Sequence, residues 1–165
     1  MVDGSKKRMT MKKIFNIMFA AVAICFSAAC QKEEIKDTVN SAIVGEWHLS
    51  TVEVDGTIQK YAIDVYLTIN SDCTFELYQK SGTEMRYTKY SGSCKTEGNI
   101  FTGKYISGRP LNGAPYTFSI EGGNLILMTA DGLEVQEYTK GSLSQEDKLA
   151  ADISTKAVSE VAPIL

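Results

Sequence analysis

Four cysteines and one histidine are the side chains whose types could support thiol, metal-binding or acid–base chemistry in this chain. His48 has no second histidine beside it, and Cys25, Cys30, Cys73 and Cys94 lack the spacings of a zinc site. The sequence also lacks Gly-x-Ser-x-Gly, a phosphate-binding glycine loop and His-Glu-x-x-His. Because a lone base lacks the partners that catalysis needs, we expect no enzyme, metal or cofactor, with His48 at the surface.

A segment typical of protein export precedes Cys30. Basic residues and then an apolar run over residues 14–26 come before small residues that lead up to the cysteine. The run is shorter than the ~20 residues of a membrane-spanning helix, so the pattern predicts a secretory signal over residues 1–29. A buried helix or a short membrane anchor is the alternative. Met11 begins the more typical signal, so residues 1–10 are interpreted as an upstream mis-start or an expression remnant.

The end of this segment, Ser27-Ala28-Ala29-Cys30, resembles a bacterial lipobox, with Ser27 in place of the usual leucine. In such lipoproteins the signal is cut before the cysteine, whose thiol receives a diacylglyceryl group and whose new amino group receives an acyl chain such as palmitate. The resemblance therefore implies that Cys30 is the lipidation site. Two or more acyl chains suffice for stable membrane anchoring.

Residues 30–42 are polar and without periodicity, which predicts a tether between the lipid and a folded domain. Within it, Gln31-Lys32-Glu33-Glu34 is similar to the short signal that sends Bacteroidota lipoproteins to the cell exterior. The resemblance implies a lipid-anchored protein of the outer membrane, exposed at the cell surface. The alternative is a plain polar tether on a protein that faces the periplasm.

The charge of the exported part limits its partners. Residues 30–165 contain 12 basic and 19 acidic side chains, a net charge of -7. A surface this acidic repels phosphate backbones, so we expect no nucleic-acid partner. It also argues against a basic membrane-binding patch, so the lipid is the expected membrane contact.

Short strands separated by turn residues fill residues 43–140. Apolar and polar side chains alternate over residues 61–69, and Asp55-Gly56 is a hairpin signal. About eight strands with short connections predict an all-β fold, an antiparallel up-and-down barrel whose closure removes exposed edges. A two-sheet sandwich is the alternative, although it usually needs longer crossovers.

The start of the first strand, Gly45-Glu46-Trp47, resembles the lipocalin superfamily, and more closely the lipocalin-like domains of Bacteroidota lipoproteins. The resemblance implies that Trp47 plugs the closed end of the barrel, under a basic residue from the last strand. Residues 133–140 contain no arginine, so that partner is missing unless Lys140 takes its place.

Residues 141–165 change character and predict a C-terminal helix. Ser144 and Asp147 fit the ends of a capping box. An apolar stripe at intervals of four follows: Leu149, Ile153, Ala157 and Val161. We expect this helix to pack on the outer wall of the barrel, with a frayed tail as the alternative.

One face of the predicted strands is bulky and apolar. An eight-stranded barrel is just wide enough either to be filled or to hold one small ligand, and the bulk of this face favours a largely filled interior. This face comprises Trp47, Leu49, Ile63, Val65, Leu67, Phe75, Leu77, Met85, Tyr87, Phe101, Tyr105, Tyr116, Phe118, Leu125, Leu127 and Val135. Trp47, Tyr87, Tyr105, Tyr116 and Phe118 are the candidate ligand-binding residues, because tyrosines among apolar walls can orient a small molecule. The alternative places these tyrosines at the rim with their hydroxyls in water.

Cys73 and Cys94 are a candidate disulfide if the protein is exported. A simple hairpin centred on Ser81-Gly82 would place Cys73 opposite a residue near Tyr90 instead. Because distant Cα atoms cannot be bridged, free thiols are the alternative.

The sequence is compatible with two functions. The first is a lipoprotein whose barrel binds a small apolar or amphipathic ligand. The second is a structural or interaction module with a filled barrel that docks a surface protein or a glycan. The size of the interior cavity would distinguish them.

Overall fold

The computed structural model describes residues 37–154 and 163–165. The predicted signal, Cys30 and most of the tether lie outside the described residues. The strands are β1 (Gly45–Val54), β2 (Thr57–Gln59), β3 (Ile63–Ile69), β4 (Thr74–Ser81), β5 (Thr88–Glu97), β6 (Ile100–Tyr105), β7 (Tyr116–Glu121), β8 (Asn124–Thr129), β9 (Glu134–Lys140) and β10 (Asp152–Ile153), and the described helix is α2 (Gln145–Ala150). No helix among these residues is long and apolar enough to span a membrane.

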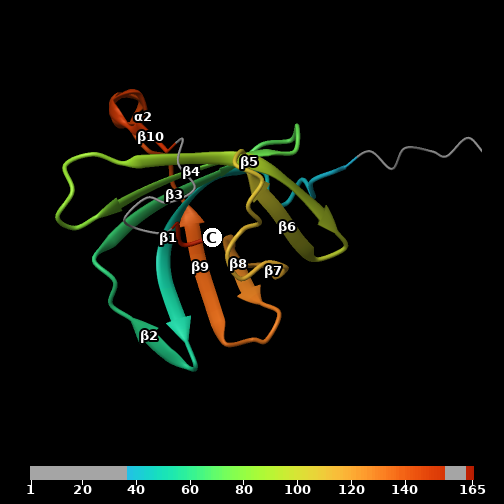
Figure 1. Ribbon diagram of the computed structural model, residues 1–165. Helices are drawn as coiled ribbons and strands as arrows, with labels where there is room; N and C mark the ends of the chain where they lie inside the picture. The colour runs from blue at the N-terminus through green and yellow to red at the C-terminus, as the bar shows by residue number, and fades with distance from the viewer. Residues whose placement is uncertain (1–36, 155–162) are drawn as a thin grey trace, which may run out of the picture. The chain divides into compact units, whose positions relative to one another are not determined.

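Eight antiparallel strands close into a barrel (Figure 1). Apart from β2 and β10, each strand pairs with the next one along the chain, and β9 returns to pair with β1. Strands β2 and β3 both pair with β1, so together they act as one long strand with an interruption. The predicted up-and-down barrel is confirmed, and the sandwich alternative is wrong.

The two-residue alternation of the sequence explains the core. In β3 the side chains of Val65, Leu67 and Ile69 are buried, whereas those of Tyr66 and Thr68 between them are partly exposed. Successive strand side chains point to opposite faces, so one face of each strand fills the interior. Each fully buried aliphatic side chain of this kind stabilises the fold by about 1.5–3 kcal/mol.

The β4–β5 connection differs from the simple hairpin that the sequence predicts. Thr74 pairs with Ser93, and β5 begins at Thr88 rather than near residue 84. The longer connection leaves Met85 97% exposed and directs Tyr87 into a cluster outside the barrel. The assignment of Met85 and Tyr87 to the interior is therefore wrong, because the turn uses residues that the prediction gave to the strand.

Strand β9 also faces opposite to the prediction. Gln136 and Tyr138 are fully buried, whereas Val135 is only partly so. The prediction followed the apolar type of Val135. In the structure the Tyr138 hydroxyl donates to Gln136 Oε1 at 2.7 Å, so the buried amide is satisfied.

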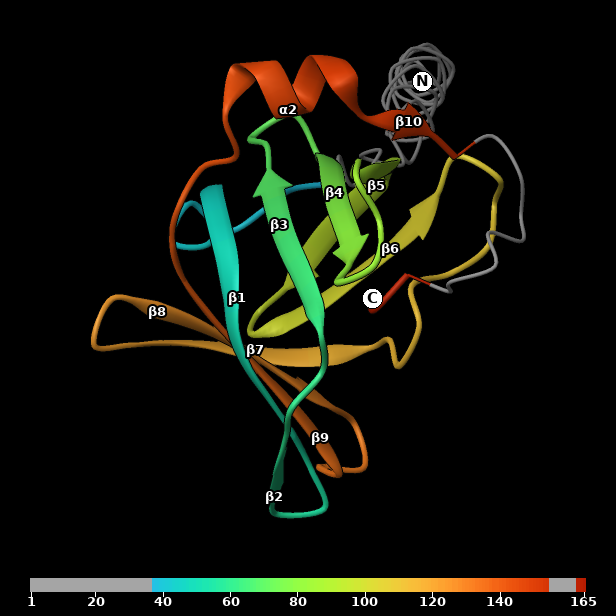
Figure 2. The same cartoon turned by 90° about the vertical axis from the view of Figure 1, so that its left-hand side faces the viewer.

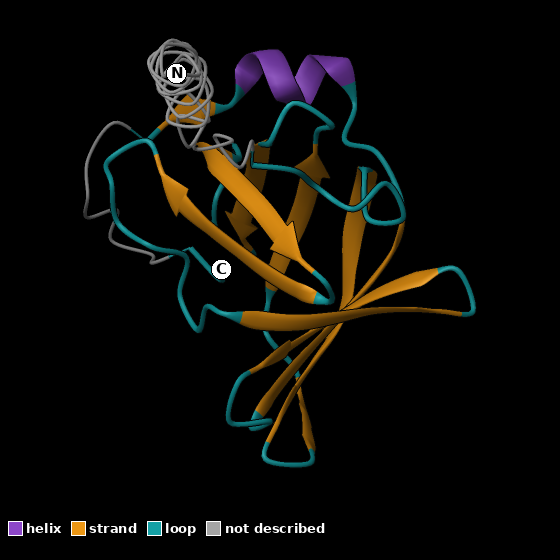
Figure 3. Ribbon diagram, turned by 90° about the vertical axis from the view of Figure 1, so that its right-hand side faces the viewer, coloured by secondary structure: helices purple, strands orange, loops and turns teal. Residues whose placement is uncertain are grey.

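The C-terminal segment forms a much shorter helix than predicted (Figures 2 and 3). Ser144 caps α2 as expected, since its hydroxyl accepts from the Asp147 N–H at 3.0 Å. The chain then becomes extended, and β10 pairs in parallel with the start of β5, beyond the point where β6 ends. Leu149 and Ile153 are 80% and 72% exposed. The predicted apolar stripe is wrong at these two positions, and Ala157 and Val161 lie outside the described residues.

Candidate functional site

Trp47 closes one end of the barrel. Its side chain is 1% exposed, and its indole N–H donates to the Ile43 carbonyl at 2.8 Å. The Lys140 Nζ atom lies 3.4 Å from the centroid of the indole ring. Lys140 thus occupies the place of the basic partner that the resemblance implied.

Gly45 makes this arrangement sterically feasible. A Cβ atom at this position would lie 2.9 Å from Lys140 Nζ. Its φ of 142° also falls in a region that L side chains rarely adopt. The glycine and the tryptophan of the Gly-x-Trp motif therefore have linked roles at this end of the barrel.

The barrel core contains four of the five candidate ligand-binding residues. Trp47, Tyr105, Tyr116 and Phe118 all belong to it, each at most 7% exposed. The Tyr116 hydroxyl donates to the Asn112 carbonyl, and burial raises the pKa of Tyr105 and of Tyr116 above their usual range. The alternative prediction, which placed these two tyrosines at the barrel rim with their hydroxyls in water, is therefore wrong.

Tyr87 instead belongs to a polar and aromatic cluster on the outer wall. Its hydroxyl donates to Asp64 Oδ2 at 2.5 Å, and Asp64 Oδ1 lies 2.8 Å from His48 Nε2. The His48 ring stacks on Tyr66 with centroids 4.4 Å apart. His48 is thus a half-exposed residue with defined partners. Within residues 37–154 and 163–165, no three His, Cys, Asp or Glu side chains gather as a metal site.

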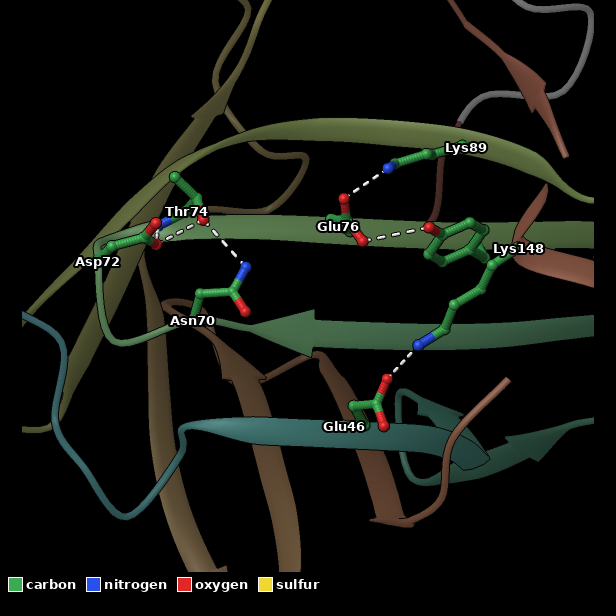
Figure 4. Close-up of polar contacts among 8 residues, drawn as sticks. Glu46, Asn70, Asp72, Thr74, Glu76, Lys89 and Lys148 are labelled. Carbon is green, nitrogen blue, oxygen red and sulfur yellow. Dashed lines mark hydrogen bonds and ion pairs between the residues drawn. The ribbon is translucent and has the colours of Figure 1, made fainter. Parts of the chain in front are cut away.

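Further polar contacts fasten the outer wall (Figure 4). Lys89 on β5 contacts Glu76 Oε1 on β4 at 2.5 Å, and Lys148 on α2 pairs with Glu46 on β1. The Tyr78 hydroxyl donates to Glu76 Oε2 at 3.1 Å. Exposed ion pairs contribute little individually. The Lys89–Glu76 pair joins β4 to β5, and the Lys148–Glu46 pair joins α2 to the barrel.

The barrel interior contains two buried glutamines that the sequence pattern did not predict. Gln79 and Gln136 are 4% and 0% exposed. Gln79 continues the inward face of β4 after Phe75 and Leu77, so the period of two could have found it. Glutamine is rarely buried unless it is hydrogen-bonded. These two side chains therefore indicate a polar site within an apolar interior.

Residues 163–165 lie against this site. The Ile164 N–H donates to Gln79 Oε1 at 2.9 Å, and Gln136 Nε2 donates to the Ile164 carbonyl at 3.4 Å. The Tyr105 hydroxyl donates to the backbone oxygen of Leu165. Leu165 is fully buried in the barrel core, and its position inside the ring of strands is marked C in Figures 1 and 2.

The connection between β6 and β7 holds the start of this segment. Asn112 Nδ2 donates to the Pro163 carbonyl at 2.6 Å, while Arg109 donates to Asn112 Oδ1 at 2.7 Å. Strands β6 and β7 share only two residue pairs, from Ile100–Phe101 to Tyr116–Thr117. They diverge beyond these pairs, and the loop that carries Asn112 bridges the gap.

Cys73 and Cys94 are adjacent across β4 and β5 but both carry free thiols. Cys73 lies in the turn just before β4, and its carbonyl accepts from the Cys94 N–H of β5 at 2.9 Å, next to the ladder pair of Thr74 with Ser93. Burial, with the nearby Cys73 sulfur second, raises the pKa of the Cys94 thiol to about 12. The prediction that Cys73 lies opposite a residue near Tyr90 is therefore wrong. The disulfide between Cys73 and Cys94 stays a prediction.

Comparison with known proteins identifies the fold. The family model of the lipocalin-like domain matches residues 43–149. The chain belongs to the lipocalin-like domain family. The boundaries of this lipocalin-like domain include the whole barrel and most of α2.

One solved structure is similar to the lipocalin-like chain, and no curated protein matches it. This structure is the lipoprotein YedD from Klebsiella pneumoniae subsp. pneumoniae MGH 78578. The identity is 12% and the TM-score 0.44, over 70% of this chain and 86% of that one.

Proposed function

We propose that this protein is a lipoprotein, anchored by acylated Cys30, whose lipocalin-like barrel binds a small apolar or amphipathic ligand without catalysis. We place it at the outer membrane, exposed at the cell surface.

The ligand-binding part of the proposal depends chiefly on one observation. Gln79, Tyr105 and Gln136 direct polar atoms into an otherwise apolar interior, and all three bond to backbone atoms of residues 164–165. Small-molecule sites combine apolar walls with a few convergent polar groups in this way. The interior therefore has the chemistry to orient an amphipathic molecule.

The anchor and the location rest on sequence features. They are the lipobox-like ending at Cys30, the Lys-acidic residues that follow it, and the net charge of -7 over residues 30–165. An acidic surface without a basic patch needs a covalent lipid to stay at a membrane.

Native mass spectrometry of the protein purified from its own envelope tests ligand binding. We expect a copurifying molecule that dissociates on denaturation. The Gln136→Leu variant should lose this molecule, because the amide that orients it is gone, whereas Tyr87→Phe on the outer wall should keep it. A folded wild-type protein that carries no molecule, and binds none of a panel of fatty acids and apolar peptides, would contradict the proposal.

The interaction-module alternative is favoured by the way side chains and residues 163–165 fill the described interior. It predicts that a surface protein or a glycan is captured by the outer loops. Crosslinking on intact cells would then identify that partner, and Gln136→Leu would leave its capture unchanged.

A further inference from the structure

We infer that residues 163–165 are a built-in occupant of the ligand site, and that the site takes extended apolar peptides of the same kind. The inference rests on the proposed function, since it names the ligand class of the same interior. The segment would then regulate the site by competing with the external peptide.

The segment of residues 163–165 is held through its backbone. Its backbone contacts come from side chains on three strands and a loop, namely Gln79, Tyr105, Asn112 and Gln136. None of the strand pairings among the described residues includes residues 163–165. The barrel thus binds this segment as it would a ligand, rather than as another strand.

The polar side chains of the site match the donors and acceptors of a peptide backbone. Gln79 accepts from an amide N–H, while Asn112, Gln136 and Tyr105 donate to three successive backbone oxygens. This pattern of one acceptor and three donors complements an extended peptide backbone. A hydrocarbon chain would offer these groups nothing in exchange for the hydrogen bonds that they make to residues 163–165, and losing hydrogen bonds to buried polar groups is costly.

The segment also makes apolar contacts in the barrel core. Leu165 is fully buried, and Ile164 packs against the same core. The site therefore selects a branched aliphatic residue at the position of Leu165. Arg109 fixes the orientation of Asn112, so the loop between β6 and β7 is already arranged to receive the carbonyl that precedes the aliphatic pair.

The route to the site is the seam between β6 and β7. With only two residue pairs across it, this seam has fewer ladder hydrogen bonds to break than the β7–β8 seam, which has six pairs. A segment that enters here can leave again without unpairing the rest of the barrel. This gives the exchange between the built-in and the external peptide a physical path.

Fluorescence anisotropy with a labelled Val-Ala-Pro-Ile-Leu peptide tests the inference. We expect the chain that ends at residue 162 to bind the peptide at least about tenfold more tightly than the full chain, because its own segment no longer competes. Leu165→Lys in the full chain should also expose the site, since a buried ammonium group is unfavourable. This second variant allows the test even if the shortened chain does not fold. The emission of Trp47 reports whether the shortened chain is folded.

Matched variants locate the binding. In the shortened chain, Tyr105→Phe should weaken peptide binding roughly five- to tenfold, the effect of one lost hydrogen bond. Tyr87→Phe removes a hydroxyl from the outer wall and should leave the affinity unchanged. A scrambled peptide should bind more weakly than the native order.

A fluorescent fatty acid in parallel separates this inference from the proposed function. Equal fatty-acid binding by the full and shortened chains, with no peptide binding, would overturn the inference and support the proposed function. Peptide binding without fatty-acid binding would support the inference and restrict the function to peptides. A folded shortened chain that binds neither would overturn both.

Discussion

The ammonium nitrogen of Lys140 on β9 lies 3.4 Å from the centroid of the Trp47 ring on β1. Trp47 is almost fully buried, and the cation lies over a face of its indole ring. A cation over an indole face contributes roughly 0.5–2 kcal/mol, depending on how far it is desolvated.

Replacing Lys140 with Met should therefore lower the free energy of unfolding by about 1 kcal/mol. Because Trp47 is the sole tryptophan of the sequence, its emission reports both the unfolding transition and the local change. Lys104→Met, at an exposed position of β6, is the matched control and should be nearly neutral. An equal loss in both variants would show that the contact does not stabilise the barrel.

Stability should fall as the pH rises above about 8.5. Burial raises the pKa of Cys94 to about 12, and it raises the pKa of Tyr105 and Tyr116 as well. Between pH ~8.5 and 12 the Cys94 thiol ionises in the unfolded chain but not in the folded one, at a cost of up to about 1.4 kcal/mol per pH unit. The stability that the neutral Cys94 thiol provides is fully present below pH ~8.5 and is lost as the pH rises from ~8.5 to 12.

Urea unfolding at several pH values measures this loss. The Cys94→Ala variant should lose stability less steeply between pH ~8.5 and 10, where the buried tyrosines do not yet contribute. Identical slopes for the variant and the wild type would contradict the role of the thiol.

Cys30→Ser should abolish acyl labelling. The serine hydroxyl cannot replace the thiol that receives the diacylglyceryl group in lipoproteins of this type. Metabolic labelling with an alkyne fatty acid, followed by membrane fractionation, checks the result, with Cys73→Ser as the control that should keep the label. A labelled Cys30→Ser protein would exclude Cys30 as the anchor, and protease accessibility on whole cells would judge surface exposure.

Mild oxidation should join Cys73 to Cys94. The Cys94 N–H donates to the Cys73 carbonyl at 2.9 Å, so the two residues are neighbours, and a disulfide can bridge Cα atoms up to about 7 Å apart. Closing the loop between them should stabilise the protein by roughly 3 kcal/mol in the chain-entropy model.

Thiol labelling under denaturing conditions follows this reaction. Both thiols should label before oxidation with oxidised dithiothreitol and neither should label afterwards, whereas in Cys73→Ser the Cys94 thiol should label throughout. Persistent labelling of both wild-type thiols would show that the pair cannot close.

Whether a strand side chain faces the barrel interior or the outer wall could be predicted only in part. Residues such as Val65 and Leu67 alternate so clearly that their inward direction follows from the sequence. On β9 the apolar type of Val135 gave the wrong prediction of the inward face. Gln136 faces the interior instead, because Tyr138 and Ile164 supply its hydrogen-bond partners. Sequence patterns register side-chain type, whereas burial of an amide depends on partners that are distant in the chain.

The sequence alone determined the all-β barrel and the cap at Ser144, because alternation and capping act between near neighbours, whereas the closing role of Trp47 was implied by the resemblance to lipocalins. The tertiary structure decided that Cys73 and Cys94 are neighbours, and that Lys140 lies over Trp47. It also decided that residues 163–165 lie inside the barrel against Gln79 and Tyr105. These contacts depend on register and on chain closure over many residues, which no local pattern encodes.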